Sequence, residues 1–173
     1  LVVLSPFEPL FGEENKDSIV AKLDYKLVWF MFMGDADSDT ERRQTYISSI
    51  WPRADVLKLG NHGSMDSSSD EWLDAVRPSV AIITAGRPDN QTLERLAARG
   101  ITVFRTDAHE EFIDDIIATT DGYSLTISQA STGKAWRIPE MTGAMLIVVP
   151  AFSGFLGNRR GPGCLDITYP AYP

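Results

Sequence analysis

Strand and helix patterns alternate between residues 27 and 105, and this alternation constrains the fold more than any other feature of the chain. Apolar or β-branched runs at 27–33, 54–59, 80–84 and 101–105 predict buried strands. Polar segments with helical spacing separate them. Successive strand–helix–strand units place parallel strands side by side through helical crossovers. We therefore expect an α/β fold with a layered sheet.

Capping and breaking residues predict where the helices begin and end. The predicted helix starts are Ser38-x-x-Glu41, Ser68-x-x-Glu71 and Asn90. The predicted ends are Pro52, Pro78 and Gly100. The three helices would thus link the four strands of the alternation.

Hairpins are predicted on both sides of this alternation. Their strands are 18–24 with 27–33, joined at Tyr25-Lys26, and 112–119 with 123–127, joined at Asp121-Gly122. From residue 128 the pattern weakens, and prolines and glycines predict an extended tail that wraps a partner or leads to another domain. Only 145–149 resembles a buried strand. We therefore expect a domain over 1–128 and a tail or linker over 129–173.

Composition sets limits on the class of protein. With 173 residues, 43% of them hydrophobic, the chain can form one domain with a real core. Its net charge of −8 repels nucleic acid and anionic membranes, although a bound divalent metal would reverse that field locally. No stretch resembles a signal peptide or reaches the ~20 apolar residues of a clear membrane span.

Two side chains follow strands of the predicted sheet. Asp35 comes after Gly34 at the end of 27–33, and His62 follows 54–59. Because the carboxyl ends of adjacent parallel strands meet at one edge of a sheet, where ligands bind, we expect Asp35 and His62 to share a metal ion or a water molecule. The plainer alternatives are a turn or capping role for Asp35 and a structural role for a lone histidine.

Three further residues are weighed as site candidates. Ser64 adds a hydroxyl beside His62 and could take part in catalysis, but loop and capping roles compete with this. Arg87 could contact an anionic substrate or be a solvated surface charge. His109 is expected to be an exposed loop histidine.

Three motifs carry a resemblance to a known family. They are Phe32-Met-Gly-Asp-Ala-Asp37, Lys58-Leu-Gly-Asn-His-Gly-Ser64 and Trp72-Leu-Asp-Ala-Val-Arg-Pro78. They resemble Leu-Thr-Gly-Asp-Ala-Glu, Lys-Val-Gly-His-His-Gly-Ser and Phe-Leu-Asp-Ala-Val-Arg-Pro of metallo-β-lactamase-fold hydrolases, above all the domain attached to ComEC-type competence proteins. The resemblance covers residues 14–127, in the same order and with close spacing.

The resemblance implies a binuclear metal hydrolase acting on phosphodiesters such as DNA. Asp35 would bridge two zinc or manganese ions, and His62 would be a ligand or a transition-state contact. The family also implies an extracytoplasmic or secreted location and a role in DNA uptake.

The chain departs from the family at three places. It lacks the His-x-His-x-Asp-His loop, Asn61 replaces the first histidine of a pair, and no Tyr-Gly-His-Pro loop follows 80–84. By this comparison it is the C-terminal half of an αββα sandwich. An N-terminal half or a second chain would supply ligands and cover one open sheet face, unless a second copy or the tail covers that face. The alternative is a metal-free binding or assembly module of the same fold.

Overall fold

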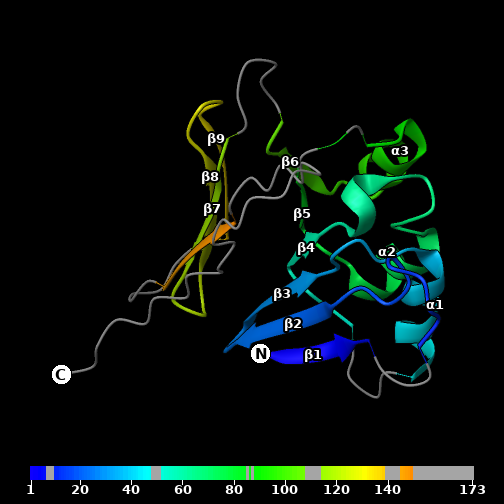
Figure 1. The fold of residues 1–173 in the computed structure, drawn as a ribbon. Coiled ribbons are helices and arrows are strands. Elements are labelled where there is room, and N and C mark those ends of the chain that lie inside the picture. The colour runs from blue at the N-terminus through cyan, green and yellow to red at the C-terminus, as the bar shows by residue number, and fades with distance from the viewer. Residues whose placement is uncertain are drawn as a thin grey trace, which may run out of the picture.

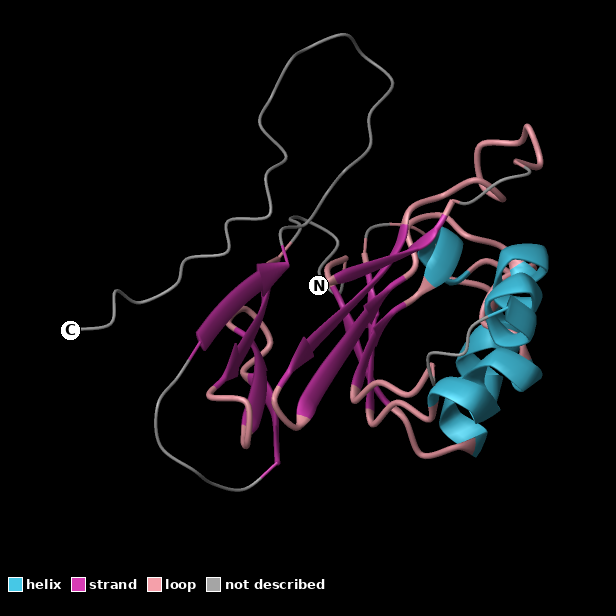
Figure 2. Cartoon of the chain, turned by 90° about the horizontal axis from the view of Figure 1, so that it is seen from below, coloured by secondary structure: helices cyan, strands magenta, loops and turns pink. Residues whose placement is uncertain are grey.

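The protein is described by a computed structural model covering residues 1–6, 10–47, 52–84, 86, 88–107, 114–138 and 145–149. Two β-sheets face each other, and helices cover the outer face of the larger sheet (Figure 1). A view from below shows the same three layers: helices, large sheet and small sheet (Figure 2). The expected α/β class is confirmed.

The larger sheet has six strands in the order β1-β2-β3-β4-β5-β6. They are β1 (Val2–Ser5), β2 (Val20–Tyr25), β3 (Val28–Phe32), β4 (Val56–Lys58), β5 (Val80–Ile83) and β6 (Thr102–Arg105). The first three are antiparallel, and β3 to β6 are parallel. Five of these strands match predicted ones, whereas β1 was not predicted.

Helices connect the parallel strands as expected. They are α1 (Ser38–Ile47), the 3₁₀ turn η1 (Gly60–Gly63), α2 (Asp70–Val76) and α3 (Asn90–Ala98). Gly100 has φ +66° just after α3, so the predicted left-handed position is confirmed.

The predicted N-caps are each wrong by one residue. The Asp37 carboxylate accepts the backbone N–H groups of Asp39 and Thr40, both at 3.1 Å, so Asp37 caps α1. Ser69 and Asp89 cap α2 and α3 in the same way. Asp, Ser and Asn are all good N-caps, and two such residues stand side by side at the start of each helix, so the sequence pattern alone did not decide between them.

The smaller sheet is antiparallel, in the order β10-β7-β8-β9. Its strands are β7 (Ile116–Thr120), β8 (Leu125–Gln129), β9 (Lys134–Ile138) and β10 (Met145–Val149). The predicted hairpin corresponds to β7 and β8, and the strand expected at 145–149 is β10. Strand β9 pairs with β8, and β10 pairs with β7, so these two segments beyond residue 128 belong to the small sheet and not to an extended tail.

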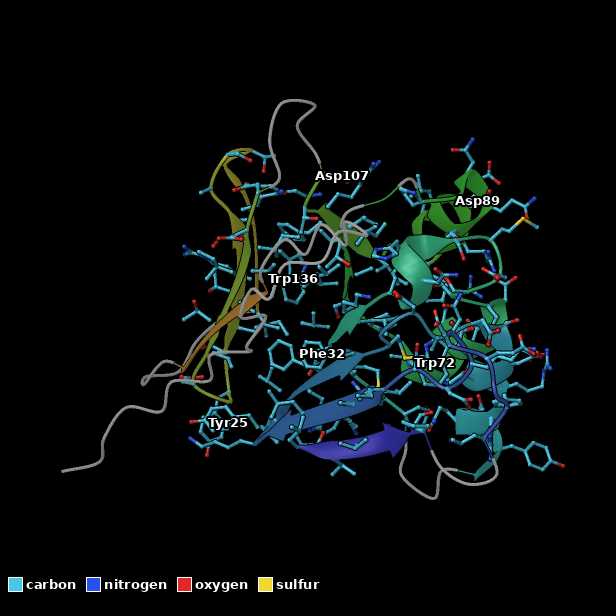
Figure 3. All side chains as sticks on the ribbon, in the orientation of Figure 1. Tyr25, Phe32, Trp72, Asp89, Asp107 and Trp136 are labelled. Carbon is cyan, nitrogen blue, oxygen red and sulfur yellow. The ribbon has the colours of Figure 1, made fainter. Side chains whose placement is uncertain are left out.

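The large sheet is buried on both faces. Met31 and Leu57 face the helices, while Phe30 and Val56 face the small sheet. Figure 3 shows Trp72 on the helix side and both Phe32 and Trp136 between the sheets. The face that we expected to need another chain, a second copy or the tail is covered by β7–β10. Of these three expected covers, the tail comes closest to what is observed, because β9 and β10 lie beyond residue 128.

We predict that the two sheets unfold as one unit. Ile127 on β8 is fully buried in the core between the sheets, so Ile127→Ala should lower the free energy of unfolding by about 2–5 kcal/mol. Amide hydrogen exchange of β5 should accelerate in parallel. Thr126→Ala, a half-buried neighbour on the other face of β8, is the control. Unchanged protection of β5 in Ile127→Ala would show that the sheets are independent.

Candidate functional site

The loops after β3 and β4 bring Asp35 and His62 together. Asp35 Oδ1 lies 3.4 Å from His62 Nε2, and the two side chains are 50% and 38% exposed. Since β3 and β4 are adjacent and parallel, the predicted meeting at their carboxyl ends is confirmed. The roles of both residues in metal binding or catalysis stay predictions.

The second ring nitrogen of His62 fixes how its protons are placed. His62 Nδ1 lies 2.8 Å from the Thr84 carbonyl oxygen, which only accepts, so Nδ1 carries a hydrogen. Nε2 is left facing the Asp35 carboxylate, 3.4 Å from Oδ1, so both atoms are open to one shared ligand.

The backbone at this site adopts a conformation that non-glycine residues avoid. Asn61 has φ 39° and His62 has φ 52°, both in the left-handed region. Each such residue costs about 1–2 kcal/mol and persists only where the surroundings hold it. Backbone strain of this kind collects at functional sites, so it supports a role for the turn beyond connecting β4 to α2.

Glycines allow the surrounding loops to come close. A Cβ on Gly60 would lie 2.2 Å from the Ala36 carbonyl oxygen, and one on Gly86 would lie 2.9 Å from His62 Cβ. The loop after β4 therefore packs directly on the backbone of the loop after β3. Gly86, which follows β5, packs against the His62 side chain.

Lys58 is a third charged residue at this edge, and sequence reasoning did not single it out. Its Nζ donates to the Gly34 carbonyl oxygen at 2.6 Å, one residue before Asp35. Burial lowers the pKa of Lys58, and the negative charge of Asp35 opposes that effect. The sequence feature that could have identified Lys58 as a site residue is its position near the end of a predicted buried strand.

Glu41 anchors the loop that follows His62. Its carboxylate accepts the backbone N–H of Ser68 at 2.5 Å and of Ser69 at 2.9 Å, so it supports the start of α2. This corrects the predicted capping box, in which Glu41 would serve its own helix. Burial raises the pKa of Glu41 to about 6 even though the two N–H groups favour the charged form.

Ser64 takes part in the hydrogen bonds of the same loop. Its hydroxyl donates to Asp66, and its carbonyl oxygen accepts the Thr92 hydroxyl at 3.1 Å. Among the described residues, no hydrogen bond joins it to His62, and its catalytic role stays a prediction. Arg87 and His109 lie outside the described residues.

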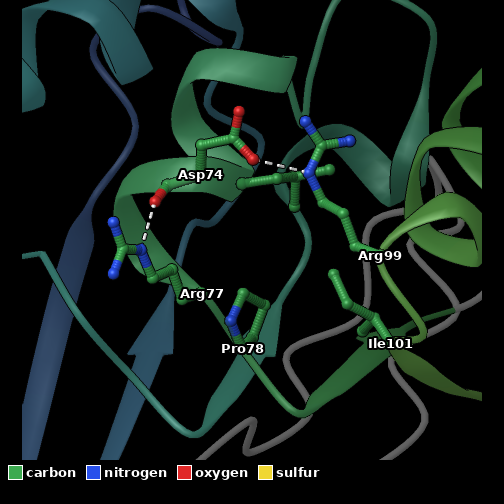
Figure 4. A pocket seen from close by; sticks show the side chains of 6 residues that line it. Asp74, Arg77, Pro78, Arg99 and Ile101 are labelled. Atoms are coloured by element: carbon green, nitrogen blue, oxygen red, sulfur yellow. Dashed lines mark hydrogen bonds and ion pairs between the residues drawn. The ribbon is translucent and has the colours of Figure 1, made fainter.

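The described ranges contain no group of three or more His, Cys, Asp or Glu side chains placed to hold a metal ion. Asp35 and His62 thus offer two ligands. A hollow of about 560 Å³ lies elsewhere, lined by Leu73, Asp74, Arg77, Pro78, Arg99 and Ile101 (Figure 4). It lies before β5 and β6, at the opposite sheet edge from His62, and Arg99 is already paired there with Asp70 and Asp74, each at 2.8 Å.

Comparison with known proteins places the chain beside competence proteins. It is 33% identical to ComE operon protein 3 of Bacillus subtilis over 113 residues, 61% of the chain and 14% of that protein. It is 35% identical to Recombination protein 2 of Haemophilus influenzae over 100 residues, 54% of the chain and 12% of that protein. It is 31% identical to Competence protein ComA of Neisseria gonorrhoeae over 112 residues, 60% of the chain and 16% of that protein.

These similarities point to a competence-related family. The chain spans between 12% and 16% of the length of these relatives. No protein-family model matches it. Within the part of the chain that the structure describes, no helix is long and apolar enough to cross a membrane.

The contact between the two site loops can be tested by adding one methyl group. Gly60→Ala should lower the free energy of unfolding by about 3 kcal/mol, because the Cβ collides with the Ala36 carbonyl oxygen. Gly100→Ala meets no atom within 4 Å and should cost only about 1–2 kcal/mol for its left-handed φ. Chemical denaturation measures both. Equal losses would argue against a tight loop contact.

The buried Glu41 should make stability depend on pH. Because its folded pKa of about 6 lies above the ordinary 4.5, its contribution is fully present below pH 4.5 and is lost as the pH rises through about 6. That contribution amounts to about 2 kcal/mol. Denaturation of the wild type and of Glu41→Gln from pH 4 to 7 should show this difference. Parallel curves for the two proteins would contradict it.

Proposed function

We propose that the chain is part of a competence-related, metal-dependent phosphodiester hydrolase of the metallo-β-lactamase type, acting on DNA. The names of the three relatives support the link to competence and recombination. The layered α/β architecture and a polar site at the carboxyl ends of parallel strands agree with it. A role in DNA uptake favours an extracytoplasmic or secreted location.

The pairing of Asp35 with His62 carries this proposal. Oxygen and nitrogen ligands bind zinc at 2.0–2.2 Å, so two ligands of one tetrahedral ion lie roughly 3.4 Å apart. Asp35 Oδ1 and His62 Nε2 are 3.4 Å apart. Metal-binding histidines also donate their other ring N–H to a carbonyl or carboxylate, as His62 does to Thr84.

The two residues fit part of a zinc or manganese site. A structural or catalytic zinc site takes three or four protein ligands, and the described residues bring two together. We therefore propose that the other ligands come from a segment with the His-x-His-x-Asp-His pattern, in the same protein or in a partner. A bound metal would supply Lewis-acid chemistry and an activated water.

The residues of this chain have separate tasks. The Thr84 carbonyl holds the proton on His62 Nδ1, which leaves Nε2 free to bind a ligand or to take a proton. Asp35 supplies negative charge and is turned toward Nε2 by Gly34, which has φ +57°. The Ser18 hydroxyl accepts the Asp35 backbone N–H at 3.2 Å and steadies that turn.

A second candidate is a metal-free binding or assembly module of the same fold. The presence of Asn61 instead of a second histidine favours it, because an amide is a weaker zinc ligand than an imidazole. In that case Nε2 of His62 would carry a proton and form an ion pair with Asp35.

We predict that Asp35→Asn abolishes hydrolysis in the full-length protein or complex that contains this chain. Loss of the carboxylate charge should lower turnover of linear DNA in manganese or zinc buffer by more than about 100-fold, since even outer-shell changes at metal sites cost 10–100-fold. The isosteric amide should leave the free energy of unfolding nearly unchanged. Asp24→Asn, a 47% exposed aspartate on β2, is the control and should keep full activity.

Zinc titration by calorimetry separates the two candidates. The metal hydrolase binds zinc, and the binding weakens in both Asp35→Asn and His62→Ala. DNA cleavage that is unchanged in Asp35→Asn would remove this residue from the mechanism. Absence of zinc binding in the full-length protein would favour the metal-free module.

A further inference from the structure

Lys58 occupies the rim between the two sheets at the edge that carries Asp35 and His62. Side chains alternate along a strand, so Lys58 is on the same face as Val56, which packs in the core between the sheets. Its neighbours in register are Phe32 on β3 and Ile82 on β5. The half-buried Lys58 therefore lies where the apolar core between the sheets meets the polar Asp35–His62 site.

Within the described ranges, the ammonium group of Lys58 is incompletely paired. It has three N–H donors, and the hydrogen bond to the Gly34 carbonyl uses one of them. Among the described residues, no carboxylate lies within ion-pair distance of it, although the charge of Asp35 acts on it from farther away, whereas Lys22 pairs with Asp24 at 3.4 Å. Removing a charge from water is costly unless it is paired and hydrogen-bonded. An incoming anion would supply what Lys58 lacks.

The hydrogen bond to Gly34 also fixes where the charge is held. This bond joins residues 24 positions apart in sequence and ties the end of β4 to the turn before Asp35. This bond holds the ammonium next to the turn that carries Asp35. A negative group bound beside Asp35 and His62 would lie within the field of Lys58.

We propose that Lys58 contacts a phosphoryl oxygen of the substrate, as the anion-binding residue of the Asp35–His62 site. The identity of the ligand rests on the function proposed above. A lysine ammonium binds phosphate as a compact point charge. The chain carries a net charge of −8 and would otherwise repel a nucleic acid backbone, so a local cation is needed where the phosphodiester is held.

Inorganic phosphate is the probe for this site. In the wild-type chain, NMR titration should give saturable shifts of the Lys58 Cε signal and of the Gly34 and Asp35 amides, with smaller shifts for Lys22. Lys58→Met should weaken phosphate binding at least tenfold. Lys22→Met, which also removes a buried lysine but lies on β2, should bind phosphate like the wild type.

Two results would overturn the inference: no saturable shift of the wild-type Lys58 signal, or phosphate binding by folded Lys58→Met with wild-type affinity. The wild-type titration decides the matter even if that variant does not fold. DNA hydrolysis tests the proposed function separately. If Lys58→Met hydrolyses DNA with an unchanged KM, the phosphate role of Lys58 is wrong and the hydrolase proposal stands. If phosphate binding depends on Lys58 but no hydrolysis occurs, the phosphate role stands and the hydrolase proposal is wrong.

Discussion

The contact between Gly60 and the Ala36 carbonyl is the constraint on which the rest of the site depends. Any side chain at position 60 would collide with that oxygen, so only glycine lets the loops after β3 and β4 leave the sheet together. This packing sets Asp35 and His62 3.4 Å apart. It also explains why the turn at His62 holds a left-handed backbone, which the loop would otherwise relax.

The charges at this edge differ from those of the chain as a whole. The protein is acidic, yet at this edge Asp35 lies near the half-buried Lys58 and beside a histidine whose Nδ1 proton is fixed by Thr84. In our proposal, the Asp35–His62 pair would hold a metal ion and Lys58 would hold a phosphate beside it. Glu41 keeps the following loop in place from α1.

Periodicity and family resemblance predicted most of the large sheet and the meeting of Asp35 with His62. Both depend on local pattern and on the geometry of parallel strands. Strand β9 was missed because Lys134–Ile138 has mostly exposed or half-buried residues and no clean alternation of polarity. Lys58 and Glu41 were missed because their partners lie 24 and 27 residues away, and only the fold brings them together.

Anomalous diffraction at the zinc edge, from crystals of the full-length protein grown with zinc, tests the central claim most directly. Our account predicts a peak within about 2.0–2.2 Å of both an Asp35 carboxylate oxygen and His62 Nε2. Direct contact between these two atoms with no anomalous peak between them, and zinc bound only elsewhere on the protein, would contradict it.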